Sequence, residues 1–162
     1  MSLARWCAIN GGMRHTDETA DVGGVDPIRV VLAEDHAEFR LGLKEMLATD
    51  GGIEVVGEAE NGAQAVALAR EVWPDVVVLD LMMPVMEGKE ALGLILREIY
   101  PPPGIVILTM HERPHLRREL LGMGASAFLA KSASLAEVIS AVKGSRPMRA
   151  PREDSGEASL AP

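Results

Sequence analysis

Short apolar runs alternate with longer stretches of helical periodicity over residues 28–143. The apolar runs have the length of strands, whereas the longer stretches place apolar side chains three or four positions apart, as on one helix face. The predicted strands are 28–33, 53–59, 75–79, 104–109 and 125–130, and the predicted helices are 37–47, 62–72, 89–99, 116–123 and 135–142. This alternation predicts an α/β fold, with a parallel sheet covered by helices on both faces.

Residues typical of helix ends flank three of the predicted helices. Asn61 and Ser134 are expected as N-caps, and Glu137 completes a capping box with Ser134. Gly124 is expected as a C-cap. The apolar face of the first predicted helix consists of Phe39, Leu43, Met46 and Leu47.

The third predicted strand ends in a carboxylate. Its apolar run 76–79 is typical of a strand buried on both faces, and Asp80 follows at the carboxyl end. The segment Met82-Met83-Pro84 then turns the chain away. Ligands of open parallel sheets bind at the carboxyl ends of the strands. Asp80 is therefore a candidate metal ligand, a candidate nucleophile, or both.

Polar residues also follow three other predicted strands, namely Glu34 and Asp35, Thr109, and Lys131. In a doubly wound, flavodoxin-like sheet of order 2-1-3-4-5 the first strand neighbours the third, so Glu34, Asp35 and Asp80 would converge. Converging carboxylates repel one another unless a cation or protons intervene. Their oxygen atoms fit Mg2+, and Lys131 would add a fixed positive charge.

This group of residues suits phosphoryl transfer. An aspartate can attack phosphorus and hold the phosphoryl group as an acyl phosphate. Mg2+ and Lys131 would neutralise the charge on the phosphoryl oxygens, and Thr109 could donate a hydrogen bond to one of them. The chain has no GxxxxGK[ST] nucleotide loop. The expected donor is therefore a phosphorylated partner or a small phosphoanhydride rather than ATP.

Composition narrows the class of protein further. The 162 residues carry a formal charge of −8, which argues against a nucleic-acid-binding surface, and 48% of them are hydrophobic, as in a globular chain. The single cysteine, Cys7, allows no intramolecular disulfide and fits a reducing compartment. Neither a membrane span nor a signal peptide is evident, so we expect a cytoplasmic protein. Residues 1–27 are interpreted as an irregular extension, 28–143 as the domain, and 144–162 as a polar, disordered tail.

Two segments give the chain a resemblance to a known family. Residues 31–36, VLAEDH, are followed by Arg40, Gly42 and Leu43, and residues 80–88, DLMMPVMEG, follow the third strand. With Thr109 and Lys131 in order behind them, these segments resemble the receiver domain of two-component response regulators, LuxR-type regulators in particular. The resemblance covers residues 28–143.

The resemblance implies a role for each residue of the site. Asp80 would be the phosphorylation site of a sensor histidine kinase. Asp35 and Asp80 would bind Mg2+ through their carboxylates, Met82 through its backbone carbonyl, and Glu34 directly or through water. Such a receiver catalyses its own phosphorylation and dephosphorylation but is not an enzyme with a separate substrate.

The resemblance also implies a switch. Thr109 would move toward the phosphoryl group and Phe128 would follow inward, which changes the face that binds an effector or a second copy of the chain. Three departures from the family stand out: Phe128 replaces the common tyrosine, Ser132 replaces the proline after Lys131 and leaves that peptide's geometry open, and the tail is too short and polar for a helix-turn-helix domain. We therefore expect no DNA-binding domain and no direct contact with nucleic acid.

Three alternatives to a phosphorylated switch were considered. The chain could be a receiver-shaped binding module that signals without phosphorylation, or the receiver part of a longer LuxR-type transcription regulator. A hydrolase with an aspartate nucleophile is disfavoured, because its acid/base position falls on Met82, which cannot transfer protons. His111 and His115 have the spacing of a helical metal pair, but they lack a third ligand and are interpreted as surface residues.

Overall fold

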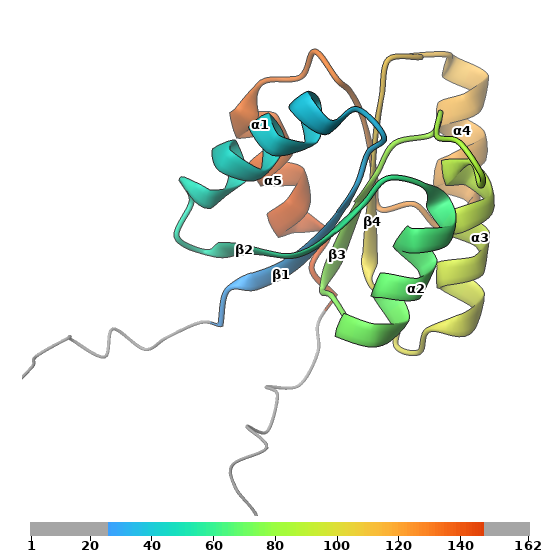
Figure 1. Ribbon diagram of the computed structural model, residues 1–162. Helices are drawn as coiled ribbons and strands as arrows, with labels where there is room; N and C mark the ends of the chain where they lie inside the picture. Colours follow the sequence, from blue (N-terminus) through green and yellow to red (C-terminus); the bar gives the residue numbers. More distant parts are fainter. Residues whose placement is uncertain (1–25, 148–162) are drawn as a thin grey trace, which may run out of the picture.

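Five parallel strands form one sheet in the order β2-β1-β3-β4-β5 (Figure 1). This computed structural model describes residues 26–147, so most of the predicted extension, with Cys7, and most of the predicted tail lie outside the described residues. The strands are β1 (Ile28–Ala33), β2 (Ile53–Ala59), β3 (Val76–Leu79), β4 (Gly104–Thr109) and β5 (Ala127–Ala130). The helices are α1 (Ala37–Ala48), α2 (Gly62–Val72), α3 (Gly88–Glu98), α4 (Pro114–Met123) and α5 (Leu135–Gly144). The predicted fold class and strand order are confirmed.

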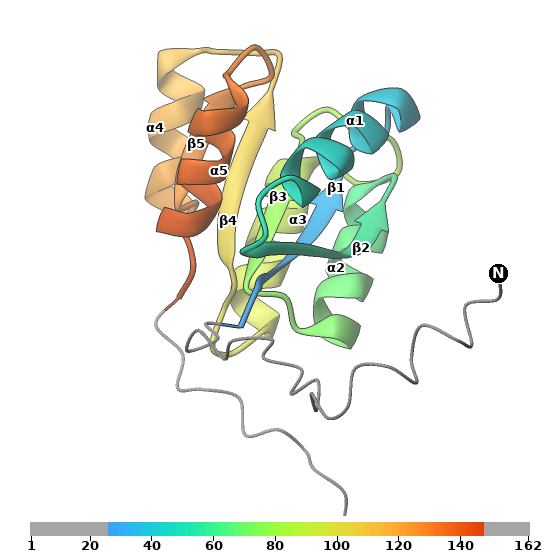
Figure 2. The ribbon, with the colours of Figure 1, turned by 90° about the vertical axis from the view of Figure 1, so that its left-hand side faces the viewer.

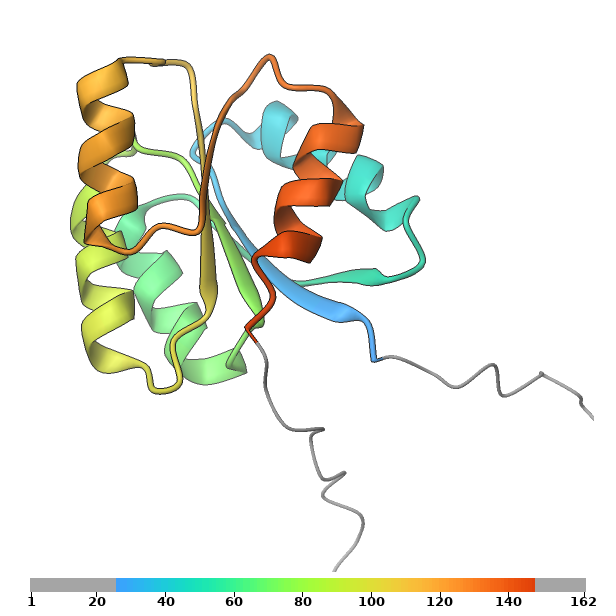
Figure 3. The same cartoon turned by 180° about the vertical axis from the view of Figure 1, so that it is seen from behind.

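The helices cover both faces of the sheet. Helices α1 and α5 lie on one face and α2, α3 and α4 on the other, as the views from the side and from behind show (Figures 2 and 3). Each face has its own apolar core because side chains alternate along a strand. In β3, Val76 and Val78 pack toward α1 and α5, whereas Val77 and Leu79 pack toward the other three helices. The unbroken apolar run before Asp80 thus reflects burial on both faces.

The helix ends predicted from the sequence are present. The Asn61 side chain accepts a hydrogen bond from Gln64 N–H at 2.9 Å, and Ser134 forms the expected capping box with Glu137. Gly124 ends α4 in the left-handed region at φ 114°. None of the helices described between residues 26 and 147 has the length and apolar character that a bilayer crossing needs.

One predicted core position and several predicted element ends differ from the structure. The fifth strand begins at Ala127 rather than at 125, and the fourth helix begins at Pro114 rather than at 116. Met46 was placed on the core face of the first helix, but it is 42% exposed, whereas Leu43 and Leu47 are buried. The last helix continues to Gly144 rather than ending at 142, and Ser145 is buried with its carbonyl against Gly104. Gly144 and Ser145 therefore belong to the domain and not to the polar tail, because the chain there closes over the start of β4.

Val85 adopts a strained backbone conformation in the loop between β3 and α3. Its φ is 67°, and Met86 N–H donates to Pro84 carbonyl at 2.7 Å, so Val85 lies at the centre of a γ-turn with positive φ. Such turns are rare and strained, and a β-branched residue fits them poorly. The side chain is 87% exposed and contributes little packing that could compensate.

Replacing Val85 with glycine should therefore stabilise the chain. Glycine adopts positive φ without the steric penalty, and after the entropy that it adds to the unfolded chain we expect a net gain of about 1 kcal/mol. Urea unfolding of V85G against wild type measures the gain, and V85A, which keeps the β-carbon at the same φ, is the matched control. A V85G variant no more stable than V85A would contradict the strain.

Candidate functional site

The carboxyl ends of four strands carry the residues that the sequence singled out. Glu34 follows β1, Asp80 follows β3, Thr109 ends β4 and Lys131 follows β5. Glu34, Asp80 and Thr109 are buried, at 3%, 4% and 0% exposed, although all three are polar. Buried carboxylates need partners, because unpaired charges are costly away from water. The partners of these buried carboxylates therefore indicate which chemistry this edge of the sheet supports.

Lys131 is the shared partner of the two buried carboxylates. Its Nζ lies 2.7 Å from Glu34 Oε2 and 3.0 Å from Asp80 Oδ2, and its side chain is only 8% exposed. The ammonium also lies 5.0 Å from the centre of the Phe39 ring, within the range of a cation–π contact. Of the predicted group Glu34, Asp35, Asp80 and Lys131, the structure thus brings Glu34, Asp80 and Lys131 into contact, whereas the contact of Asp35 is with His36.

The two carboxylates keep Lys131 charged. Burial by itself lowers the pKa of the Lys131 ammonium, but its hydrogen bonds to Glu34 and Asp80 outweigh burial and raise the pKa above the ordinary value of 10.5. Because the folded chain holds this proton more tightly than the unfolded chain, the pairing stabilises the fold fully below the ordinary lysine pKa. The contribution is lost as the pH rises through the raised pKa.

The backbone around Asp80 holds its carboxylate in place. Asp80 Oδ1 accepts a hydrogen bond from Leu81 N–H at 2.7 Å, and Met82 N–H lies 3.4 Å from the same oxygen. The start of α3 passes very close to this turn, since Gly88 N–H donates to the Leu81 carbonyl at 2.9 Å. A β-carbon at Gly88 would lie 2.0 Å from the Asp80 carbonyl oxygen, so only glycine fits there.

The acidic pair after β1 forms a group of possible metal ligands with His36. One donor atom each from Glu34, Asp35 and His36 lies within 4.8 Å of the others. The predicted Mg2+ ligands Glu34, Asp35 and Asp80 supply the carboxylate oxygens that this ion prefers, so the donor set fits. Asp35 contacts His36 and is partly exposed at 28%, unlike the buried Glu34. Met82 follows in the same turn as Asp80, and the role of its carbonyl stays a prediction.

Thr109 and Phe128 lie on the neighbouring strands β4 and β5, where Thr109 pairs with Ala130 and Phe128 with Ile107. Thr109 Oγ1 accepts a hydrogen bond from His111 N–H at 3.2 Å, so the hydroxyl holds the first turn of the loop before α4. Phe128 is 4% exposed and belongs to the core that includes Leu120 of α4. Backbone bonding joins the two strands here, because Lys131 N–H donates to the Thr109 carbonyl at 2.9 Å. Their switch roles stay predictions.

Two further points of the sequence analysis have clear outcomes in the structure. The cis peptide within residues 26–147 is Tyr100–Pro101, so the Lys131–Ser132 peptide is trans. His111 and His115 are both exposed, as expected of surface residues.

Sequence reasoning missed three residues that surround the site. His36 entered the sequence analysis only within the segment that carries the resemblance, and Phe39 only as part of the apolar face of the first predicted helix. Arg40 was quoted only as part of the resemblance, yet its guanidinium donates to the Glu34 carbonyl at 2.5 Å. The spacing of these residues could have indicated their role. Residue 36 is the N-cap of α1, and residues 39 and 40 follow three and four positions later, so their side chains lie on the same side of the helix.

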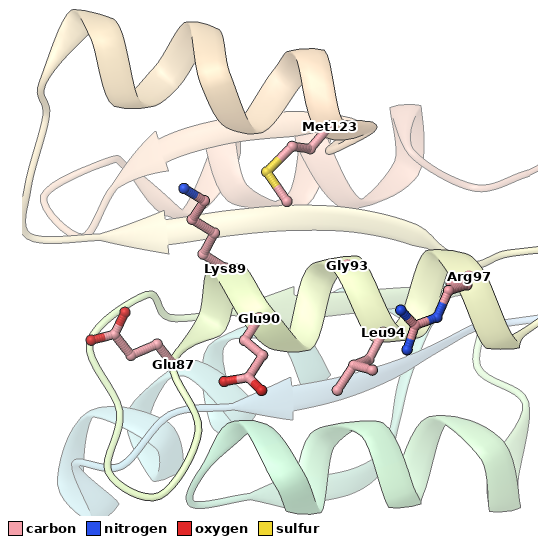
Figure 4. Close-up of a pocket in the computed structure, with 7 residues that line it drawn as sticks. All are labelled: Glu87, Lys89, Glu90, Gly93, Leu94, Arg97 and Met123. Atoms are coloured by element: carbon pink, nitrogen blue, oxygen red, sulfur yellow. The ribbon is translucent and has the colours of Figure 1, made fainter.

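A shallow hollow between α3 and α4 lies apart from these residues. Figure 4 shows its lining by Glu87, Lys89, Glu90, Gly93, Leu94, Arg97 and Met123. None of the predicted site residues contributes to it. The hollow is bridged at one place by an ion pair between Lys89 and Glu119. The functional site is therefore assigned to the carboxyl edge of the sheet.

Comparison with known protein families gives a match over nearly the whole described domain. The family model of the response regulator receiver domain matches residues 30–143. The response regulator GacA of Pseudomonas viridiflava is 39% identical over 116 residues, which are 72% of this chain and 54% of GacA. The chain spans about half the length of the curated relatives it matches.

Solved structures agree with this match. The signal receiver domain of the putative response regulator NarL from Mycobacterium tuberculosis has a TM-score of 0.68 and 34% identity, over 73% of this chain and 94% of that domain. A LuxR-family two-component response regulator from Aurantimonas sp. SI85-9A1 has a TM-score of 0.68 and 32% identity, over 76% of this chain and 90% of that structure.

Proposed function

Because the chain belongs to the response regulator receiver domain family of two-component signalling, we propose that Asp80 accepts a phosphoryl group from a sensor histidine kinase. The observation that carries the proposal is the buried Lys131 ammonium, which contacts both Glu34 and Asp80. A purely structural lysine has no reason to gather two buried carboxylates at the ligand-binding edge of a parallel sheet. A phosphorylation site needs this arrangement.

The proposed transfer is a displacement at phosphorus. An oxygen of Asp80 forms the new O–P bond while the P–N bond of the kinase phosphohistidine breaks, and the imidazole nitrogen keeps the electron pair and takes up a proton. Leu81 N–H holds one carboxylate oxygen of Asp80 in position. Lys131 remains beside the other oxygen and neutralises the negative charge that the phosphoryl group brings.

Mg2+ held by Asp35 and Asp80, with Glu34 and the Met82 carbonyl, would supply further charge neutralisation for the phosphoryl oxygens. The residue two positions after Asp80 is Met82, whose side chain is 57% exposed and cannot accept a proton. Position 82 therefore supplies no general base that could activate water for attack on the acyl phosphate. This favours storage of the phosphoryl group, and it is why we propose a switch rather than a turnover enzyme.

The proposed switch begins at Thr109. Its hydroxyl hydrogen can donate to a phosphoryl oxygen, which would draw Oγ1 away from His111 N–H and release the loop before α4. Phe128 lies on the neighbouring strand, paired with Ile107 two residues before Thr109, and would follow. Phosphorylation then shifts the population toward the arrangement that binds the phosphoryl group better, and an effector or a second copy of the chain reads the new surface.

Receivers receive their signal from a kinase inside the cell, so a cytoplasmic location is part of this proposal. The curated relatives favour one further role. The matched residues cover about half of each relative, and the printed description of the NarL relative is a probable transcriptional regulatory protein. We propose that this receiver could equally serve as the input domain of such a regulator, and the gene sequence on either side of these codons tests that role.

Acetyl phosphate tests the phosphorylation directly. We expect the full chain, incubated with acetyl phosphate and Mg2+, to gain about 80 Da for one phosphoryl group in intact-mass spectra. The adduct should not form when EDTA removes the metal. A chain that binds Mg2+ but gains no mass under these conditions would favour the binding module that signals without phosphorylation.

A further inference from the structure

We propose that Arg40 is a positioning residue, whose guanidinium holds the peptide between Glu34 and Asp35 in the orientation that Mg2+ binding needs. Arg40 is not one of the predicted metal ligands. It lies near the start of α1, and its guanidinium donates to the Glu34 carbonyl at 2.5 Å. That carbonyl belongs to the backbone between two of the carboxylates that would bind the ion. The inference rests on the proposed function, but it concerns a residue to which that function gives no role.

Hydrogen bonds from three directions hold Glu34. Its backbone N–H donates to the Ala59 carbonyl at the end of β2 at 2.9 Å, its carbonyl accepts from Arg40, and its Oε2 lies 2.7 Å from Lys131 Nζ. Because each peptide unit is planar, these bonds to the N–H and the carbonyl orient both peptide planes that flank the Glu34 α-carbon. The direction in which the chain continues to Asp35 therefore depends on Arg40.

Asp35 depends on this backbone more than Glu34 does. Its carboxylate is 28% exposed and contacts His36, whose side chain is 74% exposed, at 3.2 Å. A contact between groups so accessible to water is a weak restraint, because solvent screens it. The orientation of the preceding peptide, which Arg40 holds, therefore has the larger influence on where the Asp35 carboxylate lies.

The Arg40 side chain is itself held firmly enough to act as an anchor. It is only 11% exposed, and its Nη2 lies 3.2 Å from Glu60 Oε1, whereas its Nε lies 3.4 Å from Glu58 Oε2. The guanidinium is a planar fork, so it can hold these carboxylates and the Glu34 carbonyl in one fixed geometry. Arg40 thus links α1, the end of β2 and the acidic turn after β1.

The charge of Arg40 and its positioning role predict opposite effects on Mg2+. A positive charge beside the acidic turn repels an incoming cation, so the loss of charge by itself would strengthen Mg2+ binding. Loss of the hydrogen bond to the Glu34 carbonyl should weaken it, because Mg2+ demands nearly ideal octahedral geometry from its ligands. A role confined to joining α1 to β2 would lower the stability of the fold and leave the Mg2+ affinity of the folded chain unchanged.

Titration of the metal-free full chain with Mg2+, followed by amide chemical shifts in NMR spectra, tests the proposal. We expect Arg40→Met to weaken Mg2+ binding by about tenfold, which is typical for the loss of a residue that orients a metal ligand. Urea unfolding of each variant beforehand identifies the conditions in which the chain is folded. The affinity is then compared among folded chains only.

Arg40→Lys is the second variant, and it decides the matter if Arg40→Met does not fold. Lysine keeps the positive charge near Glu58 and Glu60 but has a single ammonium in place of the fork, so Mg2+ binding should again be weaker than in wild type. The matched control is Lys44→Met. Lys44 lies in the same helix and contacts Glu58 at 2.5 Å, so this change removes a cation from the same group of ion pairs. It should not weaken Mg2+ binding.

Unchanged or tighter Mg2+ binding in Arg40→Met overturns the proposal, as does an equal loss in Lys44→Met. Wild-type affinity in Arg40→Lys also overturns it, because the charge alone would then suffice. A wild-type chain that binds no Mg2+ overturns it as well.

Phosphorylation gives a second measurement with acetyl phosphate. The Mg2+ concentration for half-maximal rate of mass gain should rise in Arg40→Met by the same factor as the dissociation constant. The rate at saturating Mg2+ should stay at the wild-type value, and a loss confined to that rate overturns the positioning role. If wild type gains no mass at all, the proposed phosphorylation fails, whereas the Mg2+ titration still decides the role of Arg40.

Discussion

Replacement of Asp80 by asparagine should abolish the phosphoryl adduct. The amide has nearly the shape of the carboxylate, so it can still accept the Leu81 N–H hydrogen bond, but it is not a nucleophile toward phosphorus. The fold should survive, because Lys131 keeps its contact with Glu34 at 2.7 Å. Intact-mass spectra after incubation with acetyl phosphate and Mg2+ should show the adduct in wild type and none above background in D80N.

The matched control for D80N is Asp75→Asn. Asp75 is equally buried, at 4% exposed, but it precedes β3, at the opposite end of the strand. Its carboxylate accepts a hydrogen bond from Arg29 N–H at 2.9 Å, which an asparagine oxygen can also accept. D75N should therefore keep the adduct. Retention of the adduct in D80N, or its loss in both variants, would show that Asp80 is not the acceptor.

Replacement of Lys131 by methionine should be the most destabilising change at the site. Methionine fills a similar volume but leaves Glu34 and Asp80 buried without their shared cation. Removal of one partner from a buried ion pair costs about 3–5 kcal/mol, and here two carboxylates lose the same partner. Urea unfolding at pH 7 measures the loss. It should be smaller in acid, where protonation removes the unpaired charges, and smaller with Mg2+, which would replace the lost positive charge.

Lys143→Met provides the comparison for K131M. Lys143 lies 2.8 Å from Asp50, a distance like those at Lys131, but its side chain is 49% exposed. Exposed ion pairs contribute about 0–1 kcal/mol, because solvent screens them. K143M should therefore lose far less stability than K131M at the same pH. Equal losses in the two variants would mean that burial of Lys131 has no energetic consequence.

The fold followed closely from local sequence patterns. The unbroken apolar run 76–79 predicted a strand buried on both faces, and β3 packs its alternate residues into two different cores. Capping at Asn61 and Ser134 was readable because a cap depends on residues only three positions apart. Met46 was misplaced because helical periodicity cannot show how wide the buried stripe of α1 is. That width depends on how α1 lies on the sheet.

The residues of the site were also found in the sequence, because parallel topology brings strand ends together. Glu34, Asp80, Thr109 and Lys131 each follow or end a strand, so the strand order alone placed them at one edge. The strand order itself came from the general rules of doubly wound sheets and from the resemblance to receivers. The contacts of His36 and Phe39 did not follow in the same way, because they depend on the direction in which α1 leaves β1.

The sequence by itself determined which residues form the candidate site, because burial on two faces, strand ends and helix caps can all be predicted from the local spacing of residues. The tertiary structure alone decided how these residues share their charges. It showed that one ammonium serves both Glu34 and Asp80, that Glu34 Oε1 and Asp35 face an imidazole instead, and that Val85 bears a positive φ. The shared ammonium depends on side-chain positions in elements far apart in the chain, and the positive φ of Val85 depends on how the loop between β3 and α3 joins these two elements, so local spacing along the sequence specifies neither.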